Sequence, residues 1–380
     1  MRIVFAGGGT GGHIIPAIAL AQAWQERDPG AEIVFLGTAH GLERTLVPQA
    51  GYRLKLIHAR PWRRRLDLEL FRTGGAALYG FGQALAFLRR WHPALVVGTG
   101  GYVAGPVLLA AHLLGLPVVL QEQNALPGRT TRLLGRWADL VLLGYAEARA
   151  YFPCARHVVV TGNPVRREFA RPPSRAEARR RLGLDEDAFT ILALGGSQGA
   201  RSINETMLAL ADRWPRLGKA QVLHQTGAPH FAGAAERLLK LGAQERPFGA
   251  GRQMALGPLH VVPFIQDMAA ALAASDLVVS RAGALTLVEI TNLGVPAILI
   301  PYPYAADNHQ EFNARAIEKA GGARVILDRE LSAPQLWDEI RDLYEHPDTL
   351  RAMGAASRAL ARPDAAARAA ELMAGLLRRE

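Results

Sequence analysis

The chain carries two successive series of short hydrophobic runs that alternate with segments of helical spacing. In the first half, runs rich in β-branched residues with little polar alternation occur at 2–6, 32–36, 94–98, 117–120, 139–143 and 157–161. Strands that are covered on both faces, as in a parallel sheet, have this pattern. Residues 16–27 and 75–92 have the spacing of helices. The first half therefore predicts a doubly wound α/β domain.

A second series begins after the proline-rich segment 161–173, which predicts a linker. Its hydrophobic runs occur at 190–194, 221–224, 259–262, 277–280 and 297–300. Residues 332–380 predict closing helices, and residues 241–257, which show neither period, predict a surface loop. We expect two Rossmann-like parallel-sheet domains that face each other across a cleft, at 1–163 and 164–345, with helices at 346–380 that return to pack on the first domain.

Length and composition describe an ordinary globular protein that does not depend on an oxidising compartment. A chain of 380 residues with 49% hydrophobic and 21% charged residues is long enough for two cores. The single cysteine, Cys154, cannot form an intramolecular disulfide. The first apolar run is too short for a signal peptide, and no apolar run is long enough to span a bilayer.

The protein is strongly basic, with a net charge of +10 and a pI near 10.2. A basic protein attracts polyanions such as nucleic acid, anionic lipid headgroups or phosphorylated substrates. Only four of the 44 basic residues are lysines, so a preference for arginine accounts for part of the excess. The sign of the charge does not choose among these partners.

Glycine-rich loops follow three of the predicted strands. Gly7 to Gly12 follow the first strand and precede His13 and a helical segment, and similar loops occur at 98–101 and 195–199. Glycines at a strand-to-helix turn let the backbone approach an anion, and the helix N-terminus offers unpaired amides. One such loop is equally well explained as a tight turn. Three of them, from both domains, favour a ligand site in the cleft.

A dinucleotide-binding oxidoreductase is the first alternative for such loops. It requires an acidic residue about 20 residues after the glycines, at the end of the second strand. That strand ends here in Leu36, Gly37 and Thr38. The missing acid disfavours this class of enzyme.

Two further clusters follow predicted strands of the second half. Small residues between Ser280 and Ala284 begin a helix and would expose amides to a diphosphate, while Glu289 is either a ribose ligand or an ordinary acid near a helix start. The polar run 307–313 has the donors and acceptors that sugar hydroxyls require. His309 predicts a solvated turn residue, because no second histidine or cysteine stands at metal-ligand spacing.

Together these segments resemble glycosyltransferase family 28, in its peptidoglycan-synthesis branch, over essentially the whole chain. The resemblance rests on GGGTGGHIIPA, GTGGYVAGP, QEQNALPG, TGNPVR, GGSQGARSIN, FIQDM, SRAGALTLVE and ADNHQEFNA. It implies a GT-B fold and the transfer of N-acetylglucosamine (GlcNAc) from UDP, with inversion and without a metal ion or other cofactor. The acceptor it implies is the 4-hydroxyl of N-acetylmuramic acid (MurNAc) in undecaprenyl-diphospho-MurNAc-pentapeptide, which is lipid I. Two departures are Ile15, where an aromatic residue is common, and a longer segment at 246–254.

The resemblance also implies which residues bind UDP-GlcNAc. In chain order they are Thr10, Gly11, Gly12 and Asn124 toward the sugar and the acceptor; Arg166 and Ser197 at the diphosphate; the backbone of Ile265 at uracil; Ala284, Leu285, Thr286, Leu287, Val288 and Glu289 at phosphate and ribose; and Gln310 at the GlcNAc hydroxyls.

The catalytic base has three candidates. His13 is the first, because it ends the first glycine loop and a histidine titrates near neutrality. Glu122 and Tyr102 are alternatives or positioning groups. In the competing interpretation, His13 orients an acceptor phosphate without moving a proton.

Peripheral attachment to an anionic membrane surface is a separate prediction. Arg60, Trp62 and the arginines at 63–65 precede the apolar and aromatic segment 78–91, which suits a membrane interface. The alternative is a helix that faces the core and has a basic edge. We expect a location at the cytoplasmic face of the cell membrane, other cell-wall synthesis proteins as partners, and no nucleic acid.

Two rival functions use the same features. One is a GT-B enzyme that makes a glycolipid from another UDP-sugar, such as UDP-galactose. The other is a binding module that senses a nucleotide without chemistry.

Overall fold

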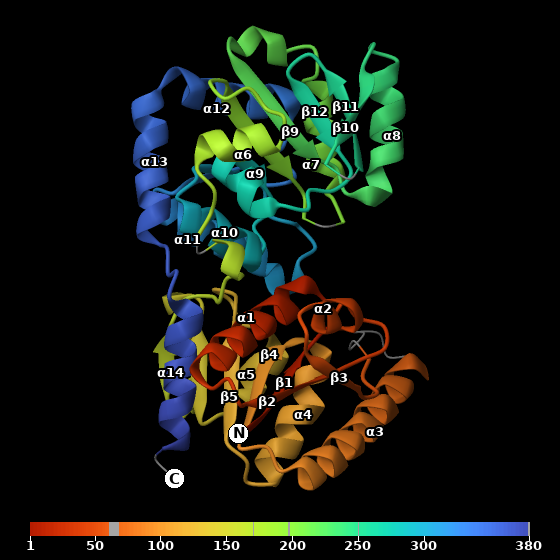
Figure 1. Cartoon of the computed structure of the whole chain (residues 1–380), viewed down its shortest axis with the longest axis vertical. Helices are drawn as coiled ribbons and strands as arrows, with labels where there is room; N and C mark the ends of the chain where they lie inside the picture. Colours follow the sequence, from red (N-terminus) through yellow and green to blue (C-terminus); the bar gives the residue numbers. More distant parts are fainter. Residues whose placement is uncertain (61–67, 170, 197, 250, 379–380) are drawn as a thin grey trace. The chain divides into compact units, whose positions relative to one another are not determined.

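The chain forms two α/β units in the computed structural model, which describes residues 1–60, 68–169, 171–196, 198–249 and 251–378 (Figure 1). Unit 1 comprises Met1–Arg167 and Arg362–Glu380, and unit 2 comprises Glu168–Ala361. The domain boundaries expected from the sequence differ from this division at two places. Residues 164–167 belong to unit 1, and residues 346–361 belong to unit 2.

Unit 1 is built on a parallel sheet whose strand order is β3-β2-β1-β4-β5-β6-β7. The strands are β1 (Arg2–Gly7), β2 (Glu32–Gly37), β3 (Arg53–Leu56), β4 (Leu95–Gly100), β5 (Val118–Glu122), β6 (Leu140–Leu143) and β7 (Val158–Val160). Because β1 leads to β2 on one side and is flanked by β4 on the other, the order reverses between β1 and β4. A crevice at the carboxyl ends of such a pair is the usual ligand position in open α/β sheets.

Helices cover both faces of this sheet. Buried residues of α3 (Leu68–Trp91), α4 (Gly101–Leu113) and α5 (Arg129–Leu134) pack on one face. Those of α1 (Gly11–Arg27), α2 (Glu43–Gln49) and the C-terminal α14 (Ala365–Leu377) pack on the other. Helix α14 lies beside α1 although the two are far apart in the sequence (Figure 1). The core of unit 1 thus includes the last helix of the chain.

Unit 2 contains a sheet with the order β10-β11-β12-β9-β8-β13-β14-β15. Its strands are β8 (Phe189–Leu194), β9 (Ala220–Gln225), β10 (Gln244–Phe248), β11 (Gly251–Leu256), β12 (Leu259–Val262), β13 (Leu277–Ser280), β14 (Ala297–Leu299) and β15 (Ala323–Val325). All neighbouring strands are parallel except in the β10-β11-β12 meander, which is antiparallel. The strand order reverses between β8 and β13.

The helices of unit 2 complete two layers around the sheet. Residues of α7 (Arg201–Ala209), α8 (Ala228–Leu239) and α12 (Ala333–Glu345) share one core cluster with the strands. The helices α6 (Arg175–Arg181), α9 (Met268–Ala274), α10 (Ala284–Leu293) and α13 (Pro347–Ala359) form a series of neighbouring contacts. Helix α11 (His309–Lys319) packs against β15.

Part of the secondary structure was predicted wrongly from the hydrophobic pattern. Residues 241–257, expected to be a loop, contain the antiparallel strands β10 and β11. β10 is a polar, exposed edge strand, and β11 beside it begins with the exposed Gly251 and Arg252 and buries only Gln253, Met254 and Ala255, so neither has the continuous apolar run of a buried strand. In the described part of the chain, no helix is both long and apolar enough to cross a membrane.

Candidate functional site

In unit 1, two glycine loops meet at the carboxyl ends of β1 and β4. The first loop joins β1 to α1, and the second joins β4 to α4 without an intervening residue, since β4 ends at Gly100 and α4 begins at Gly101. The Thr99 hydroxyl donates to the His13 carbonyl at 2.8 Å, which ties the second loop to the first turn of α1. Sheet topology therefore brings His13 and Tyr102 to one place.

The hydrogen bonds of His13 fix its tautomer. Its Nδ1 lies 3.1 Å from the carbonyl oxygen of Thr99 and 3.2 Å from Oε1 of Gln123. The Gln123 amide nitrogen itself donates to the Thr99 carbonyl, so its Oε1 is an acceptor. Both neighbours of Nδ1 are acceptors, so Nδ1 carries the proton and Nε2 of the neutral ring carries the lone pair. This is the form that a general base requires.

Close packing explains why glycine stands at Gly101. Its φ is +76°, and a Cβ there would lie 2.4 Å from the carbonyl oxygen of Gly8 and 3.2 Å from Cδ2 of His13. A side chain at this position would push the two loops apart. Glycine at position 101 therefore allows the two loops and His13 to pack closely, apart from any contact that it makes with a ligand.

Glu122 lies at the end of β5 as a buried carboxyl. Its Oε1 accepts from the backbone amide of Asn124 at 2.8 Å and from the Asn124 side chain at 3.1 Å. Burial raises the pKa of Glu122 above its ordinary value, and the hydrogen bonds from Asn124 and Thr131 oppose that rise. The carboxyl orients the Asn124 side chain.

In unit 2, a pocket of about 610 Å³ occupies the reversal between β8 and β13. Ligand pockets commonly have this size. The lining comes from the loop after β8, the start of α10, the turn after β14 and the start of α11, and it includes Gly196, Gly199, Arg281, Thr286 and Gln310. The two sequence-predicted residues Thr286 and Gln310 are thus brought to one pocket.

Arg281 is the residue that sequence reasoning missed in this pocket. Its guanidinium donates to the carbonyls of Ile300 and Pro301 at 3.1 Å each, to Asp328 at 2.5 Å and to the Ser202 hydroxyl at 2.9 Å. Ser202 also donates to Asp328 at 2.6 Å. Arg281 therefore joins four segments that line the pocket. Its position directly after a predicted strand was the available signal.

In the run 284–289 only Leu285 and Thr286 are half-buried, and the other side chains are buried. Ala284, Leu285 and Thr286 form the first turn of α10, whose amides lack partners four residues earlier in the helix. The Leu287 amide donates to the Gly283 carbonyl at 3.0 Å, and the side chains of Leu287, Val288 and Glu289 are buried. Only the first turn presents backbone donors.

The remaining predicted residues of unit 2 have partly occupied polar groups. The Ile265 amide donates to Oε1 of Gln225 at 2.8 Å, which leaves its carbonyl as the backbone group it can offer. Oε1 of Gln310 accepts from the Tyr302 amide at 3.0 Å, so its side-chain amide nitrogen is the donor it can offer. Ser197 lies outside the described residues.

Four further predicted residues belong to unit 1, namely Thr10, Gly11, Gly12 and Arg166. Thr10 is exposed and precedes α1, where its carbonyl accepts from the His13 and Ile14 amides. Gly11 and Gly12 form the first turn of α1. Arg166 is half-buried in the segment that follows β7.

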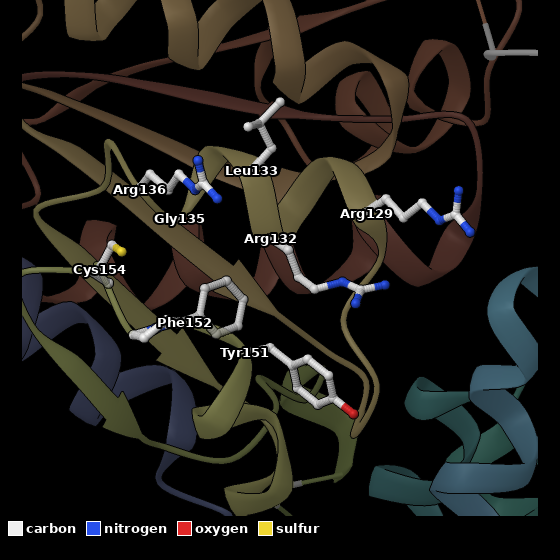
Figure 2. Close-up of a pocket in the computed structure, with 10 residues that line it drawn as sticks. Arg129, Arg132, Leu133, Gly135, Arg136, Tyr151, Phe152 and Cys154 are labelled. Carbon is white, nitrogen blue, oxygen red and sulfur yellow. The ribbon is translucent and has the colours of Figure 1, made fainter.

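Unit 1 has a cavity of about 540 Å³ that is lined by three arginines (Figure 2). We call it the arginine pocket; its arginines are Arg129, Arg132 and Arg136, from α5 and the residues that follow it. Tyr151 lies across from them, with its ring 5.4 Å from the guanidinium carbon of Arg132. The exposed Cys154 also lines the cavity. No acidic residue lines it among the described residues.

Comparisons with known proteins give the family. Residues 3–143 match the Glycosyltransferase family 28 N-terminal domain, and residues 190–369 match the Glycosyltransferase family 28 C-terminal domain. A Desulfitobacterium hafniense protein named UDP-N-acetylglucosamine--N-acetylmuramyl-(pentapeptide) pyrophosphoryl-undecaprenol N-acetylglucosamine transferase is 45% identical over 365 residues, 96% of each chain. A Desulforudis audaxviator protein of the same name is 42% identical over 96% of this chain and 95% of its own.

The fold agrees with these matches. The crystal structure of Acinetobacter baumannii MurG aligns with a TM-score of 0.75 and 29% identity, over 98% of this chain and 99% of that one. The two parallel-sheet units are those of the GT-B architecture expected from the sequence. The chain therefore belongs to glycosyltransferase family 28 and is a hexosyltransferase of GT-B fold.

Proposed function

We propose that this protein transfers GlcNAc from UDP-GlcNAc to the 4-hydroxyl of MurNAc in undecaprenyl-diphospho-MurNAc-pentapeptide, with inversion at the anomeric carbon. The observation that carries the proposal is the 45% identity, over 96% of the chain, to a relative named for this transfer. The pocket between β8 and β13 supports it, because it has amide donors, an arginine and a glutamine at one sheet edge.

The donor is held mainly by unit 2 in this proposal, and Arg166 of unit 1 is also assigned to it. The diphosphate lies at the first turn of α10, where amides and the helix dipole favour an anion. The Gln310 amide nitrogen donates to a GlcNAc hydroxyl, and the Ile265 carbonyl accepts from N3–H of uracil. Glu289 is assigned to the ribose, and Arg166 and Ser197 to the diphosphate.

The chemical step uses His13 as the base. The 4-hydroxyl oxygen of the acceptor forms a bond to C1 of GlcNAc as the bond from C1 to the phosphate oxygen breaks and its electron pair leaves with UDP. The hydroxyl proton passes to Nε2 of His13, while Nδ1–H stays with Thr99 and Gln123. Glu122 is a positioning residue that holds Asn124, and Tyr102 lies at the same glycine loops as His13.

Metal independence is part of the proposal. A helix N-terminus and arginine can stabilise the charge that develops on the departing diphosphate, which is the task of a metal ion in other transferases. Turnover is expected to be unchanged in EDTA. Activity that disappears with the chelator and returns with a divalent ion would contradict this part alone.

Unit 1 meets an anionic membrane surface in this proposal, as a peripheral protein at the cytoplasmic face. On one face of the sheet, α3 exposes Leu78 and Tyr79 by 73% and 60%, and α5 exposes Leu133 beside the arginine pocket by 50%. Exposed apolar side chains beside arginines suit an interface with anionic lipids. Trp62 and the arginines at 63–65 lie outside the described residues. Other cell-wall synthesis proteins are further proposed partners.

A transfer assay tests the proposal against its rivals. Purified protein receives UDP-GlcNAc or UDP-galactose with a lipid I analogue, and both UDP and the disaccharide product are measured. UDP release with the GlcNAc disaccharide supports the proposal. Turnover only with another sugar or acceptor indicates a different glycolipid enzyme, and binding without release indicates a nucleotide sensor.

The variant His13→Ala tests the base. We expect a loss of turnover of about 100-fold or more, since general-base catalysis contributes factors of this size. His346→Ala is a matched control, because His346 is an exposed histidine of unit 2 that pairs with Asp342. Near-normal turnover of folded His13→Ala would leave His13 without a proton-transfer role.

A further inference from the structure

A carboxylate that the sequence did not single out lies behind the first glycine loop. Glu43, the first residue of α2, is fully buried. Its Oε2 accepts from the Gly9 amide at 2.9 Å, and its Oε1 accepts from the Thr38 amide at 2.9 Å and the Thr38 hydroxyl at 2.8 Å. One side chain therefore connects the loop after β1 to the loop after β2.

The connection extends to Tyr102 in the second glycine loop. The Thr38 hydroxyl donates its hydrogen to Glu43. In its 3.2 Å contact with the Tyr102 hydroxyl, the Thr38 oxygen is therefore the acceptor and the Tyr102 hydroxyl is the donor. The phenolic hydrogen of Tyr102 thus points at Thr38. In this arrangement Tyr102 offers a ligand only an acceptor.

Neighbouring glycines make room for the carboxylate. A Cβ on Gly8, Gly37 or Gly41 would come within 2.6, 2.6 and 1.9 Å of Glu43 atoms. On the other side of the loop, Gly9 has a φ of +88°, and a Cβ there would lie 2.8 Å from the Tyr102 ring. The first loop is therefore held between Glu43 and Tyr102.

The burial of the Glu43 carboxylate has an energetic cost. Removing a carboxylate from water is unfavourable, and buried ionic groups are often no more stabilising than apolar residues of similar size. Hydrogen bonds from three donors offset that cost; one donor, the Gly9 amide, belongs to the loop that leads into His13, and the other two belong to Thr38 in the loop after β2. The Gly9 amide is occupied by Glu43 and does not add to the donors available for a phosphate.

We infer that Glu43 is a positioning residue, which fixes the first glycine loop and thereby sets the position of His13 toward the acceptor hydroxyl. The inference rests on the proposed function, because it takes His13 as the base. It assigns the first loop to placing that base, with Tyr102 held in register by the same carboxylate.

The test compares Glu43→Gln with Asp139→Asn. Glutamine keeps the size of the side chain but turns an amide donor toward either Gly9 or Thr38. Asp139 is the matched control, because it is a carboxylate of the same unit that accepts from the Val118 amide at 2.9 Å, at the start of β5 and away from the glycine loops. Both variants lose a carboxylate that holds a backbone amide.

Kinetics and hydrogen exchange are measured on all three full-length proteins. For Glu43→Gln we expect kcat/KM for the acceptor to fall by about 10- to 100-fold, as for a small displacement of a catalytic group, with the KM for UDP-GlcNAc within about twofold of the wild type. Exchange at residues 7–13 should rise. Asp139→Asn should instead raise exchange near Val118 and leave both kinetic constants near wild type.

A smaller change keeps the inference testable if Glu43→Gln does not fold. Thr38→Val removes only the hydroxyl between Tyr102 and Glu43, and it should lower acceptor kcat/KM without changing the KM for the donor. Two results would show that Glu43 has only a structural role. One is an equal loss of acceptor kcat/KM in Asp139→Asn, and the other is a KM for UDP-GlcNAc in Glu43→Gln that rises by the same factor as acceptor kcat/KM falls. If the wild type transfers no GlcNAc, the proposed function fails, and exchange at residues 7–13 alone decides the role of Glu43.

Discussion

The buried histidine of unit 2 makes acid stability predictable. His224 on β9 has no exposed surface, and its Nε2 donates to Oδ1 of Asn204 on α7 at 3.0 Å. The Asn204 amide nitrogen donates in turn to the Thr226 carbonyl at 2.9 Å. Burial lowers the pKa of His224 from 6.5 to about 3. The folded protein therefore keeps this ring neutral at pH values where the unfolded chain binds a proton.

The sign and size of the effect follow from linkage. Above pH 6.5 the ring is neutral in both states and the free energy of unfolding does not depend on it. As the pH falls from 6.5 toward the folded pKa of about 3, stability is lost by up to 1.36 kcal/mol per pH unit. Between pH 6.5 and 4.5 this amounts to about 2 kcal/mol, because the slope reaches its full value only below the unfolded pKa.

The variant His224→Gln isolates the contribution. A glutamine can place its amide nitrogen near the position of Nε2 and donate to Asn204, but it does not titrate. Urea unfolding at several pH values, followed by hydrogen exchange at residues 220–226, gives the free energy of unfolding of unit 2. We expect the wild type to lose about 2 kcal/mol more than the variant between pH 6.5 and 4.5.

The offset between the two proteins at pH 7.5 measures packing and does not enter the comparison. Parallel losses in both proteins would show that His224 is already protonated in the folded state, or that it is buried in the unfolded ensemble. Either result would refute the argument from burial.

Three further predictions concern the site. The raised pKa of folded Glu122 stabilises the wild type fully below pH 4.5, and this stabilisation is lost as the pH rises toward the folded pKa. The melting temperature of Glu122→Gln should therefore rise relative to that of the wild type from pH 4.5 upward, and a constant offset would contradict this. Arg281→Lys should raise the KM for UDP-GlcNAc by about 10-fold, because an ammonium cannot reproduce the fork of donors to Asp328 and its neighbours; steady-state kinetics should show an unchanged acceptor KM. Gly101→Ala should lower both thermal stability and turnover, because its φ of +76° and the contact with Gly8 oppose a side chain; wild-type turnover would show that the loops can separate freely.

Most of the central strands were predictable from the sequence, because strands buried on both faces carry continuous apolar runs. β1, β8 and β13 follow such runs closely. The edge strands β3 and β15 were missed, since both Arg53–Leu56 and Ala323–Val325 contain charged residues that interrupt the apolar run. The apolar pattern of a segment indicates how far it is buried, and these two edge strands are only partly buried.

The site was predictable where one segment carries the signal, and not where distant residues combine. The glycine loops and Gln310 stand in recognisable segments, and the structure places Gln310 and Thr286 in one pocket. Arg281 has its partners at Ser202, Ile300 and Asp328, which no local pattern connects. Glu43 is a single acid in an ordinary helix start, and its meaning depends on the sheet order that brings β2 beside β1.

The return of α14 to unit 1 sets an order of events during synthesis on the ribosome. Ala369, Met373 and Ala374 of this helix share a core cluster with Ile14, Leu20 and Trp24 of α1. The nascent first unit must therefore wait, with that apolar surface uncovered, until all 194 residues of Glu168–Ala361 have been translated. Unit 2 is continuous and can close first, so a chaperone that shields the α1 surface would be needed most while the second unit is emerging.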